Sequence, residues 1–473
     1  MSEDVHIRFL KLLGWDGVEL EGFLPKWRKT AEFLHLTDTD VAFAVDEWLP
    51  TYWDMSMLGT RKFIAAVIRE AVAMSQAGDY ISAGESVIYS MMPSAAVCVY
   101  ANRIAGGGKV HIFYPYFIIA TVWTAFFGRE LDASFNGSRL DPACQHCAMN
   151  CLRADSTIKG MIVPPTVIWN WGLQCDEAPK TDEMLKRLEK AGWKSVLTTI
   201  PHDAPLGMDE SKDDGRVSYL AEEMRVAQSY ITGYTGVPLQ DEHMSRALVE
   251  YLGYLRRVER LTDLVMNSDP VPMYGNDLTL FSLCMECAFD TGYDYINDAL
   301  DTAIAEVEQR ISEGSGVLPK GSPKLACHFS PLNVPWIDKV FRDNGVNLTL
   351  GRMFPPASQL IKCVNPGDAY RSAASMCLEA PNNVNMLDEV RMTCDQLNKY
   401  PVDGALYGFF AFDRWIGALE KIMIREAEER TGIPHFYLEG DFWNGASFSL
   451  DDKLATIRGI CSCLKISGLA SNK

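Results

Sequence analysis

The chain has 473 residues, of which 48% are hydrophobic and 11% aromatic, and its formal net charge is -18 at pH 7. This length exceeds one ordinary hydrophobic core and predicts two or three lobes, while the apolar content excludes a largely disordered chain. The negative charge argues against a nucleic-acid partner, because binding to phosphate backbones requires clustered Lys and Arg. It also argues against binding to an anionic membrane surface.

The N-terminus has neither the cationic start nor the apolar segment of a signal peptide. No run of about 18 uncharged apolar residues occurs, and the longest apolar stretch, residues 111–128, is broken by Pro115. We interpret that stretch as a buried strand and helix. Thirteen cysteines in a chain without an export signal favour a cytoplasmic location and metal binding over disulfide bonds.

The first 84 residues predict a helical N-terminal region, because apolar residues recur at helical spacing. Residues 85–207 predict a first α/β lobe that carries a cysteine cluster. Its evidence is an amphipathic helix over 181–192 and four short apolar segments typical of strands: 86–93, 109–115, 160–169 and 193–201.

Residues 208–318 predict a helical middle segment, in which two long stretches each place apolar residues on one stripe. The first stripe consists of Met244, Leu248, Tyr251, Leu252, Leu255 and Val258. The second consists of Ile296, Leu300, Ile304, Val307 and Ile311. A connector rich in Gly, Pro and Ser then spans 312–323 and marks a lobe boundary.

Residues 319–473 predict a C-terminal α/β lobe, with strands at 324–329, 346–351, 403–410 and 433–441 and helices between them. Alternating strands and helices predict a doubly wound parallel sheet in each of the two lobes. Such sheets bind ligands at the carboxyl ends of their strands. In this lobe those ends carry Phe329, Ser330, Asp413, Arg414 and residues 439–441.

Cysteines at positions 144, 147 and 151 are spaced two and three residues apart, and Cys175 follows a predicted strand. Thiolates at such spacing converge on one centre in zinc and iron–sulfur sites. The alternative is an irregular segment in which the cysteines only pack. Two other pairs, Cys284 with Cys287 and Cys461 with Cys463, are interpreted as structural because buried Cys is common.

The segment 164–189 resembles a family sequence in which a Pro-rich strand start leads to a Cys about ten residues on. The same family order continues through residues 346–359, 368–390, 403–410 and 432–444, with APNNVN, VDGA and GIP as its clearest signposts. The resemblance is to the larger subunit of the 2-hydroxyacyl-CoA dehydratases, including 2-hydroxyglutaryl-CoA dehydratase, which share a superfamily with benzoyl-CoA reductase. It covers about residues 140–205 and 324–465.

This resemblance implies a lyase subunit, of the 2-hydroxyacyl-CoA dehydratase type, active in anaerobic metabolism. It implies an oxygen-sensitive 4Fe-4S iron–sulfur cluster that faces a coenzyme A thioester, and radical chemistry carried by that cofactor. It also implies a heterodimer with a smaller homologous subunit and an ATP-dependent activator protein that donates one electron. The acyl group of the substrate is not implied.

For the cluster ligands, the resemblance matches Cys151 to the first family Cys, with Cys147 as the nearby alternative, and Cys175 to the second. The third family Cys is replaced by Asp413. Either Asp413 completes the cluster, or Cys327 is recruited, or the chain is a cluster-free structural or substrate-binding subunit. A mononuclear-metal hydro-lyase using Cys151, Cys175 and Asp413 is a further alternative. The cluster hypothesis predicts that these ligands converge at a cleft between the lobes.

Overall fold

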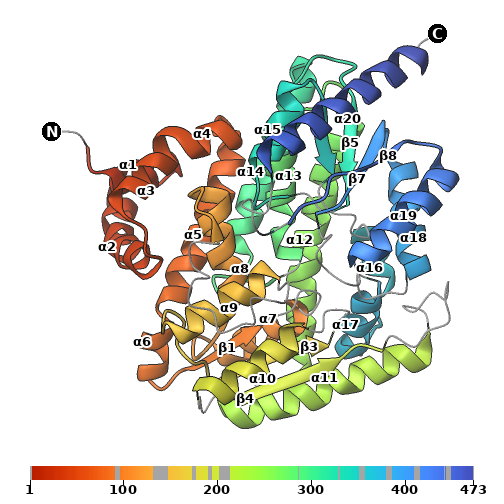
Figure 1. The fold of residues 1–473 in the computed structure, drawn as a ribbon. Helices are drawn as coiled ribbons and strands as arrows, with labels where there is room; N and C mark the ends of the chain where they lie inside the picture. Colours follow the sequence, from red (N-terminus) through yellow and green to blue (C-terminus); the bar gives the residue numbers. More distant parts are fainter. Residues whose placement is uncertain are drawn as a thin grey trace.

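A computed structural model gives the fold of the chain (Figure 1). The structure describes the following residues: 3–90, 96–131, 147–172, 177–189, 194–201, 213–285, 287–328, 331–350, 357–379, 386–409, 416–441, 443 and 449–471. None of the helices within these ranges is both long enough and apolar enough to span a lipid bilayer.

The N-terminal region is helical, as predicted. Its first helix begins after Asp4, whose side chain accepts hydrogen bonds from the backbone N–H groups of His6 and Ile7. Thr37 and Asp40 form a capping box at the start of the third helix. The helices are α1 (Val5–Leu12), α2 (Gly17–Phe33), α3 (Asp38–Phe43), α4 (Leu49–Tyr52), α5 (Leu58–Ser75) and α6 (Ala77–Ser82), with a π-helical turn at Ala44–Trp48.

The first sheet has four parallel strands in the order β2-β1-β3-β4. The strands are β1 (Ser86–Ser90), β2 (Val110–Phe113), β3 (Val167–Gly172) and β4 (Lys194–Thr199). The chain around them forms α7 (Ala96–Gly106), α8 (Pro115–Ala120), a π-helical turn (Thr121–Phe126), α9 (Ala148–Ile158) and α10 (Glu177–Glu189). The apolar stretch 111–128 is therefore a buried strand and helix, which confirms its interpretation.

The middle segment is helical, with α11 (Asp214–Thr235), α12 (Asp241–Asn267), α13 (Gly275–Phe281), a short 3-10 turn (Leu283–Met285) and α14 (Asp294–Glu313). All six residues of the predicted α12 stripe are buried. The α14 stripe is buried at Ile296, Leu300 and Val307, but Ile311 is 37% exposed near the end of the helix. Figure 1 shows α12 passing between the two sheets.

The second sheet repeats the parallel arrangement in the order β6-β5-β7-β8. Its strands are β5 (Lys324–Cys327), β6 (Asn347–Leu350), β7 (Gly404–Tyr407) and β8 (His435–Tyr437). The helices of this half are α15 (Trp336–Asp343), α16 (Ala357–Lys362), α17 (Ala369–Leu378), α18 (Met386–Lys399), α19 (Ile416–Thr431) and α20 (Leu450–Ser471). Two four-stranded parallel sheets with a helical N-terminal region confirm the predicted fold class.

Three hydrophobic clusters form the interior. The largest joins the N-terminal helices, the first sheet, the middle helices and α17 in one continuous core. The other two lie on opposite faces of the second sheet: one contains residues of α15 and α20, the other residues of α18 and α19. The proposed division at residues 84, 207 and 318 stays a prediction, and the shared core joins its first three parts.

One glycine explains how the second sheet contacts the middle helices. A Cβ atom at Gly275, the first residue of α13, would lie 1.8 Å from the carbonyl oxygen of Leu348 on β6. No side chain fits at that separation, so only glycine allows the helix to approach the strand this closely. The two halves of the molecule are therefore held in direct backbone contact at this point.

Candidate functional site

The two sheets share one topology, and this topology identifies two edges as candidate ligand sites. In each sheet the strand order reverses between the first and third strands, which are β1 and β3 in one and β5 and β7 in the other. Open parallel sheets bind ligands outside the carboxyl ends of the strands, at this switch point. The residues that follow β1, β3, β5 and β7 are therefore the first place to seek functional side chains.

Two of the predicted ligands follow the inner strands at these switch points. Cys175 comes three positions after the end of β3, and Asp413 comes six positions after the end of β7. Both residues lie outside the described ranges, as do Phe329, Ser330 and Arg414. The predicted convergence of Cys175 with Asp413 therefore stays a prediction, supported by the sequence position of each residue shortly after an inner strand.

The other two predicted ligands lie one turn apart at the start of α9. Cys147 is the N-cap residue, and the backbone N–H of Cys151 donates to the carbonyl oxygen of Cys147 at 3.0 Å. Both side chains are partly exposed. The unpaired N–H groups of a helix N-terminus favour negative charge, so this position suits thiolate ligands. Cys327, the alternative third ligand, fits less well because it is buried in a hydrophobic core. Cys284 and Cys287, interpreted as structural, are buried too.

No described group of three or more His, Cys, Asp or Glu residues has an arrangement that could hold a metal ion. A metal centre in this chain would accordingly require residues from the segments outside the described ranges, as the ligand set with Cys175 and Asp413 does.

A buried polar cluster lies at the carboxyl end of β5. His328 directly follows that strand, and its Nε2 lies 3.2 Å from Oε1 of Glu389 while its Nδ1 lies 3.3 Å from Oε1 of Glu420. Glu389 belongs to α18 and Glu420 to α19, and all three side chains are fully buried. The second oxygen of Glu420, Oε2, has no hydrogen-bond partner among the residues that the structure describes.

The two contacts of His328 require one proton more than a neutral imidazole and two ionised carboxylates carry. A neutral imidazole has a single N–H and cannot donate to two ionised carboxylates, so either His328 is an imidazolium or one carboxyl group is protonated. Burial alone acts to lower the pKa of His328, but the hydrogen bonds and charges of Glu389 and Glu420 outweigh it and raise that pKa. The stabilisation from the imidazolium is thus complete below the ordinary value of 6.5 and is lost as pH rises through the raised pKa.

The sequence did not identify this cluster. His328 has no metal-ligand spacing, and Glu389 and Glu420 lie on helices where acidic residues are usually solvated. The signal that could have placed His328 is the alternation of side chains along β5. Ala326 faces α18 and α19, and Cys327 faces the other side of the sheet. The next residue, His328, therefore faces the helices again.

The residues directly after β7 and β8 also lie in close contact. Gly408 has φ +117°, and a Cβ atom there would lie 2.4 Å from the carbonyl oxygen of Leu438. The N–H of Gly440 donates to the carbonyl oxygen of Gly408 at 3.0 Å. Residues 439–441, predicted at this edge, therefore lie beside the exit of β7, from which the chain continues toward Asp413.

Comparison with known proteins decides the family. A profile described as 2-hydroxyglutaryl-CoA dehydratase, D-component, matches residues 151–456, well over half of the chain. The chain is a member of this D-component family. The match begins at Cys151 and includes Cys175, Asp413 and the cluster around His328, so the predicted resemblance is confirmed.

Two relatives of this D-component family member are subunits of larger enzymes. The chain is 23% identical over 288 residues to the (R)-2-hydroxyisocaproyl-CoA dehydratase alpha subunit of Clostridioides difficile, covering 60% of the chain and 69% of that subunit. It is 28% identical over 158 residues to a benzoyl-CoA reductase subunit of Thauera aromatica, covering 30% of the chain and 36% of that protein.

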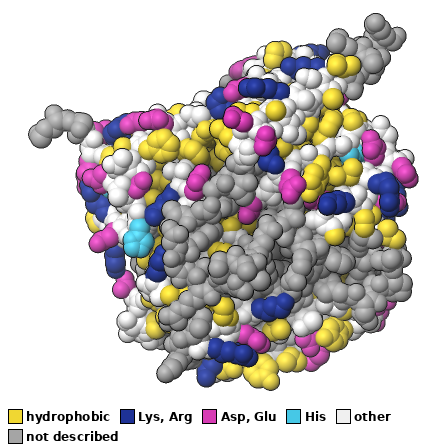
Figure 2. All heavy atoms as spheres, viewed as in Figure 1, with side chains coloured by type: hydrophobic (Ala, Val, Ile, Leu, Met, Phe, Trp, Pro, Cys, Tyr) yellow, Lys and Arg dark blue, Asp and Glu magenta, His cyan; other side chains and the backbone are white. Residues whose placement is uncertain are grey.

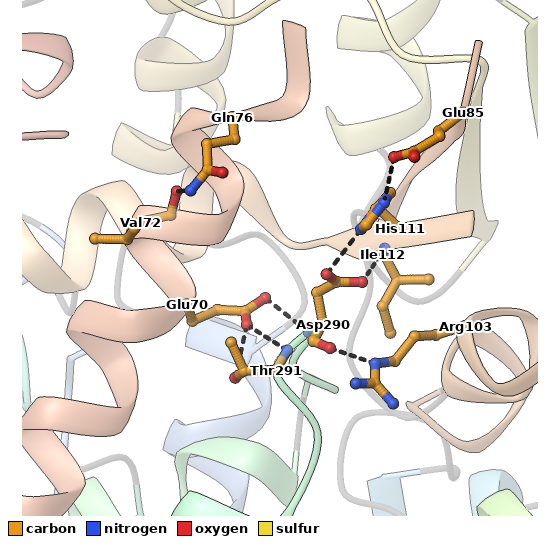
Figure 3. Close-up of polar contacts among 9 residues, drawn as sticks. All are labelled: Glu70, Val72, Gln76, Glu85, Arg103, His111, Ile112, Asp290 and Thr291. Carbon is orange, nitrogen blue, oxygen red and sulfur yellow. Dashed lines mark hydrogen bonds and ion pairs between the residues drawn. The ribbon is translucent and has the colours of Figure 1, made fainter. Parts of the chain in front are cut away.

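The first 150 residues lie outside the D-component match, but a buried polar network ties them to the matched part (Figure 3). Glu70 of α5 accepts hydrogen bonds from the backbone N–H groups of Asp290 and Thr291, at 2.9 and 3.0 Å. The Asp290 carboxylate in turn contacts His111 Nδ1 on β2 at 3.0 Å, and His111 Nε2 contacts Glu85 at 3.0 Å. The network is therefore structural and fixes the N-terminal helices against the first sheet.

We expect this network to make stability depend on pH. Burial, together with the negative charge of Asp290, raises the pKa of Glu70 from 4.5 to about 8. A raised pKa means that the fold favours the protonated acid, so the contribution to stability is complete below 4.5 and is lost as pH rises through about 8. The free energy of unfolding should fall over this window by at least about 1.4 kcal/mol, the equivalent of one pKa unit.

Urea unfolding of wild type and Glu70→Gln, between about pH 5 and pH 9, measures this decline. The variant should show a flatter profile, because glutamine carries no charge at any pH. Glu19→Gln is the matched control, since Glu19 is an exposed partner of Arg69 and should leave the profile unchanged. An identical slope in wild type and Glu70→Gln would contradict the assignment.

Proposed function

We propose that the chain is a subunit of an oxygen-sensitive, iron–sulfur-dependent enzyme that acts on coenzyme A thioesters by one-electron chemistry. The reaction would be of the 2-hydroxyacyl-CoA dehydratase type, which makes the enzyme a lyase, or of the related aromatic acyl-CoA reductase type. The observation that carries this proposal is the D-component match over residues 151–456, which includes β3 and β4 of the first sheet and all four strands of the second. The names of both relatives, each a subunit of an enzyme of CoA esters, support it.

The proposed ligands of a 4Fe-4S cluster are Cys151 or Cys147, Cys175 and Asp413. Support comes from the helix N-terminus that carries the first two residues and from the exits of β3 and β7 that precede the others. The thiolate donors suit iron, whereas the carboxylate of Asp413 is a harder ligand than the cysteine of the family pattern. Such a cluster would supply one-electron transfer to the thioester.

The protein's own contribution would be to bind and orient the thioester between the two sheet edges and to exclude water there. The proposed partners are a smaller homologous subunit and an ATP-dependent activator protein, and the proposed location is the cytoplasm of an anaerobic cell. The subunit names of both relatives support an assembly of more than one chain.

A second function is favoured by the residue at position 413. With an aspartate where the family pattern has cysteine, the chain would act as a cluster-free structural or substrate-binding subunit, and its partner would hold the cluster. A mononuclear-metal hydro-lyase using Cys151, Cys175 and Asp413 is the third candidate.

One experiment separates the three. The chain is purified without oxygen, alone and with a homologous subunit, and its iron, acid-labile sulfide, visible absorption and turnover of a 2-hydroxyacyl-CoA ester are measured. A brown chain that bleaches in air and contains iron and sulfide in equal amounts supports the first function. A colourless chain that is active only with its partner supports the second. A colourless chain that is active alone rules out both and supports the third.

A further inference from the structure

The outer face of α11 carries a stripe of exposed hydrophobic side chains. The stripe consists of Tyr219, Val226, Tyr230 and Tyr234, which are 48%, 43%, 55% and 38% exposed. Their spacing of seven, four and four residues places them on one side of the helix. The opposite side buries Leu220, Met224 and Ile231 and packs against β4 and α17. The helix thus has two apolar faces, and within the described part of this chain only one of them is covered.

Exposed hydrophobic residues are usually scattered singly over a protein surface, whereas the four residues of this stripe lie together. The described residues include twelve exposed large hydrophobic side chains, and four of them lie on this one helix of 22 residues. Tyrosine is enriched at the centres of protein interfaces. Figure 1 shows α11 along the outer edge of the fold, and Figure 2 shows hydrophobic side chains at that edge. The stripe has the composition of a contact surface.

The stripe is also poor in charge. Between its hydrophobic residues the only charged side chain at an exposed position is Glu222, and the other exposed positions are Ser229 and Gly233. The nearby cation Arg225 forms an ion pair with Asp368 at 2.7 Å. A net charge of -18 makes copies of this chain repel each other, and a face with few charged side chains reduces that repulsion.

Gly233 indicates what kind of surface covers the stripe. Glycine inside a helix lowers helix stability relative to alanine, and a Cβ atom at Gly233 would meet nothing within 4 Å. Packing within the chain therefore does not require glycine at this position. In an antiparallel pair of α11 helices with the two-fold axis at Val226, residues seven positions either side of it lie opposite each other. Gly233 then faces Tyr219 of the partner helix, and the missing side chain leaves room for its ring.

The same axis matches a second pair of positions. Residues four positions either side of Val226 are Glu222 and Tyr230, so the acidic side chain of one copy lies opposite the tyrosine hydroxyl of the other. A hydroxyl that donates to a carboxylate forms a charge-assisted hydrogen bond. The stripe is thus complementary to itself in size and in hydrogen bonding, which is what a two-fold symmetric contact requires.

We propose that α11 forms the contact of a homodimer of this chain, in which two copies pack antiparallel about Val226. The occupant of the stripe is a second copy of the same chain. This proposal does not depend on the proposed function.

The test measures the mass of the full chain in solution by sedimentation velocity over a range of concentrations. Wild type should sediment as a dimer, and Gly233→Gln should raise the dissociation constant at least about tenfold, because the new side chain fills the space for the partner's Tyr219. The same variant should keep or raise the thermal midpoint, since glutamine is a better helix former than glycine. Loss of the dimer then cannot be attributed to unfolding.

Val249→Gln is the matched control, because Val249 is 69% exposed on α12 and lies outside the stripe. This variant should sediment as wild type does. A wild-type chain that stays monomeric at every concentration overturns the proposal, as does a dimer that survives both Gly233→Gln and Tyr230→Glu. Assembly with a homologous subunit alone, with no self-association, also overturns it.

Discussion

Replacing Cys175 with serine is expected to remove the iron and the visible absorption of the anaerobically purified chain and to abolish turnover of the CoA ester. Cys175 follows β3 at the switch point of the first sheet, and two other candidate thiols lie at the start of α9. A site with three protein ligands that loses one of its two thiolates no longer holds a cluster, because serine is a poor ligand for iron at neutral pH. Iron and sulfide analysis of the purified variant measures the effect.

Cys463→Ser is the control, because Cys463 is exposed on α20 and far along the chain from the proposed ligands. It should retain full iron content. A second variant tests position 413: Asp413→Cys restores the thiolate of the family pattern and should raise iron content and slow its loss in air. If Cys175→Ser keeps its iron, the proposed ligand set is wrong even where the family assignment holds.

Replacing His328 with leucine is expected to lower the free energy of unfolding by about 3–5 kcal/mol, because it leaves two buried carboxylates without their cation. Glu389 and Glu420 lie 3.2 and 3.3 Å from the imidazole nitrogens and are fully buried, so neither can turn to solvent. Guanidinium unfolding of wild type and variant at neutral pH measures the difference.

His435→Leu is the control in the same layer of the fold. His435 stacks on the Tyr407 ring at 5.4 Å, which His328 also contacts, but it forms no ion pair with any residue the structure describes. Replacing His435 should lower the free energy of unfolding by much less than replacing His328. A triple variant that combines His328→Leu with Glu389→Gln and Glu420→Gln should recover stability, since no buried charge remains. If the single variant is as stable as wild type, the cluster does not hold the charges assigned to it.

The cluster around His328 matters for the site because of its position in the chain. His328 is the last residue described before 329–330, Glu389 lies in the first turn of α18 after 380–385, and Glu420 lies near the start of α19 after 410–415. One buried group of charges thus anchors the ends of three elements that border the candidate site. A buried ion pair adds little net stability, so its value here lies in fixing this geometry.

Local patterns in the sequence were sufficient for the elements and for the fold class. The short apolar runs that became β1 to β8 and the 3.6-residue period of the α12 stripe from Met244 to Val258 are properties of neighbouring positions. The same reasoning placed Cys175 and Asp413 after strands. It was less accurate at Ile311, because periodicity does not show where a helix end leaves the core.

Only the tertiary structure decided which distant residues meet. The sequence separations from His328 to Glu389 and to Glu420 are 61 and 92 residues, and no local pattern encodes such a contact. Likewise, α17 joins the core of the first sheet although it lies in the C-terminal part of the chain. The order of strands in each sheet and the exposed hydrophobic face of α11 were likewise decided only by the tertiary structure. They depend on how helices and strands pack together, and a sequence states only what each of them contributes.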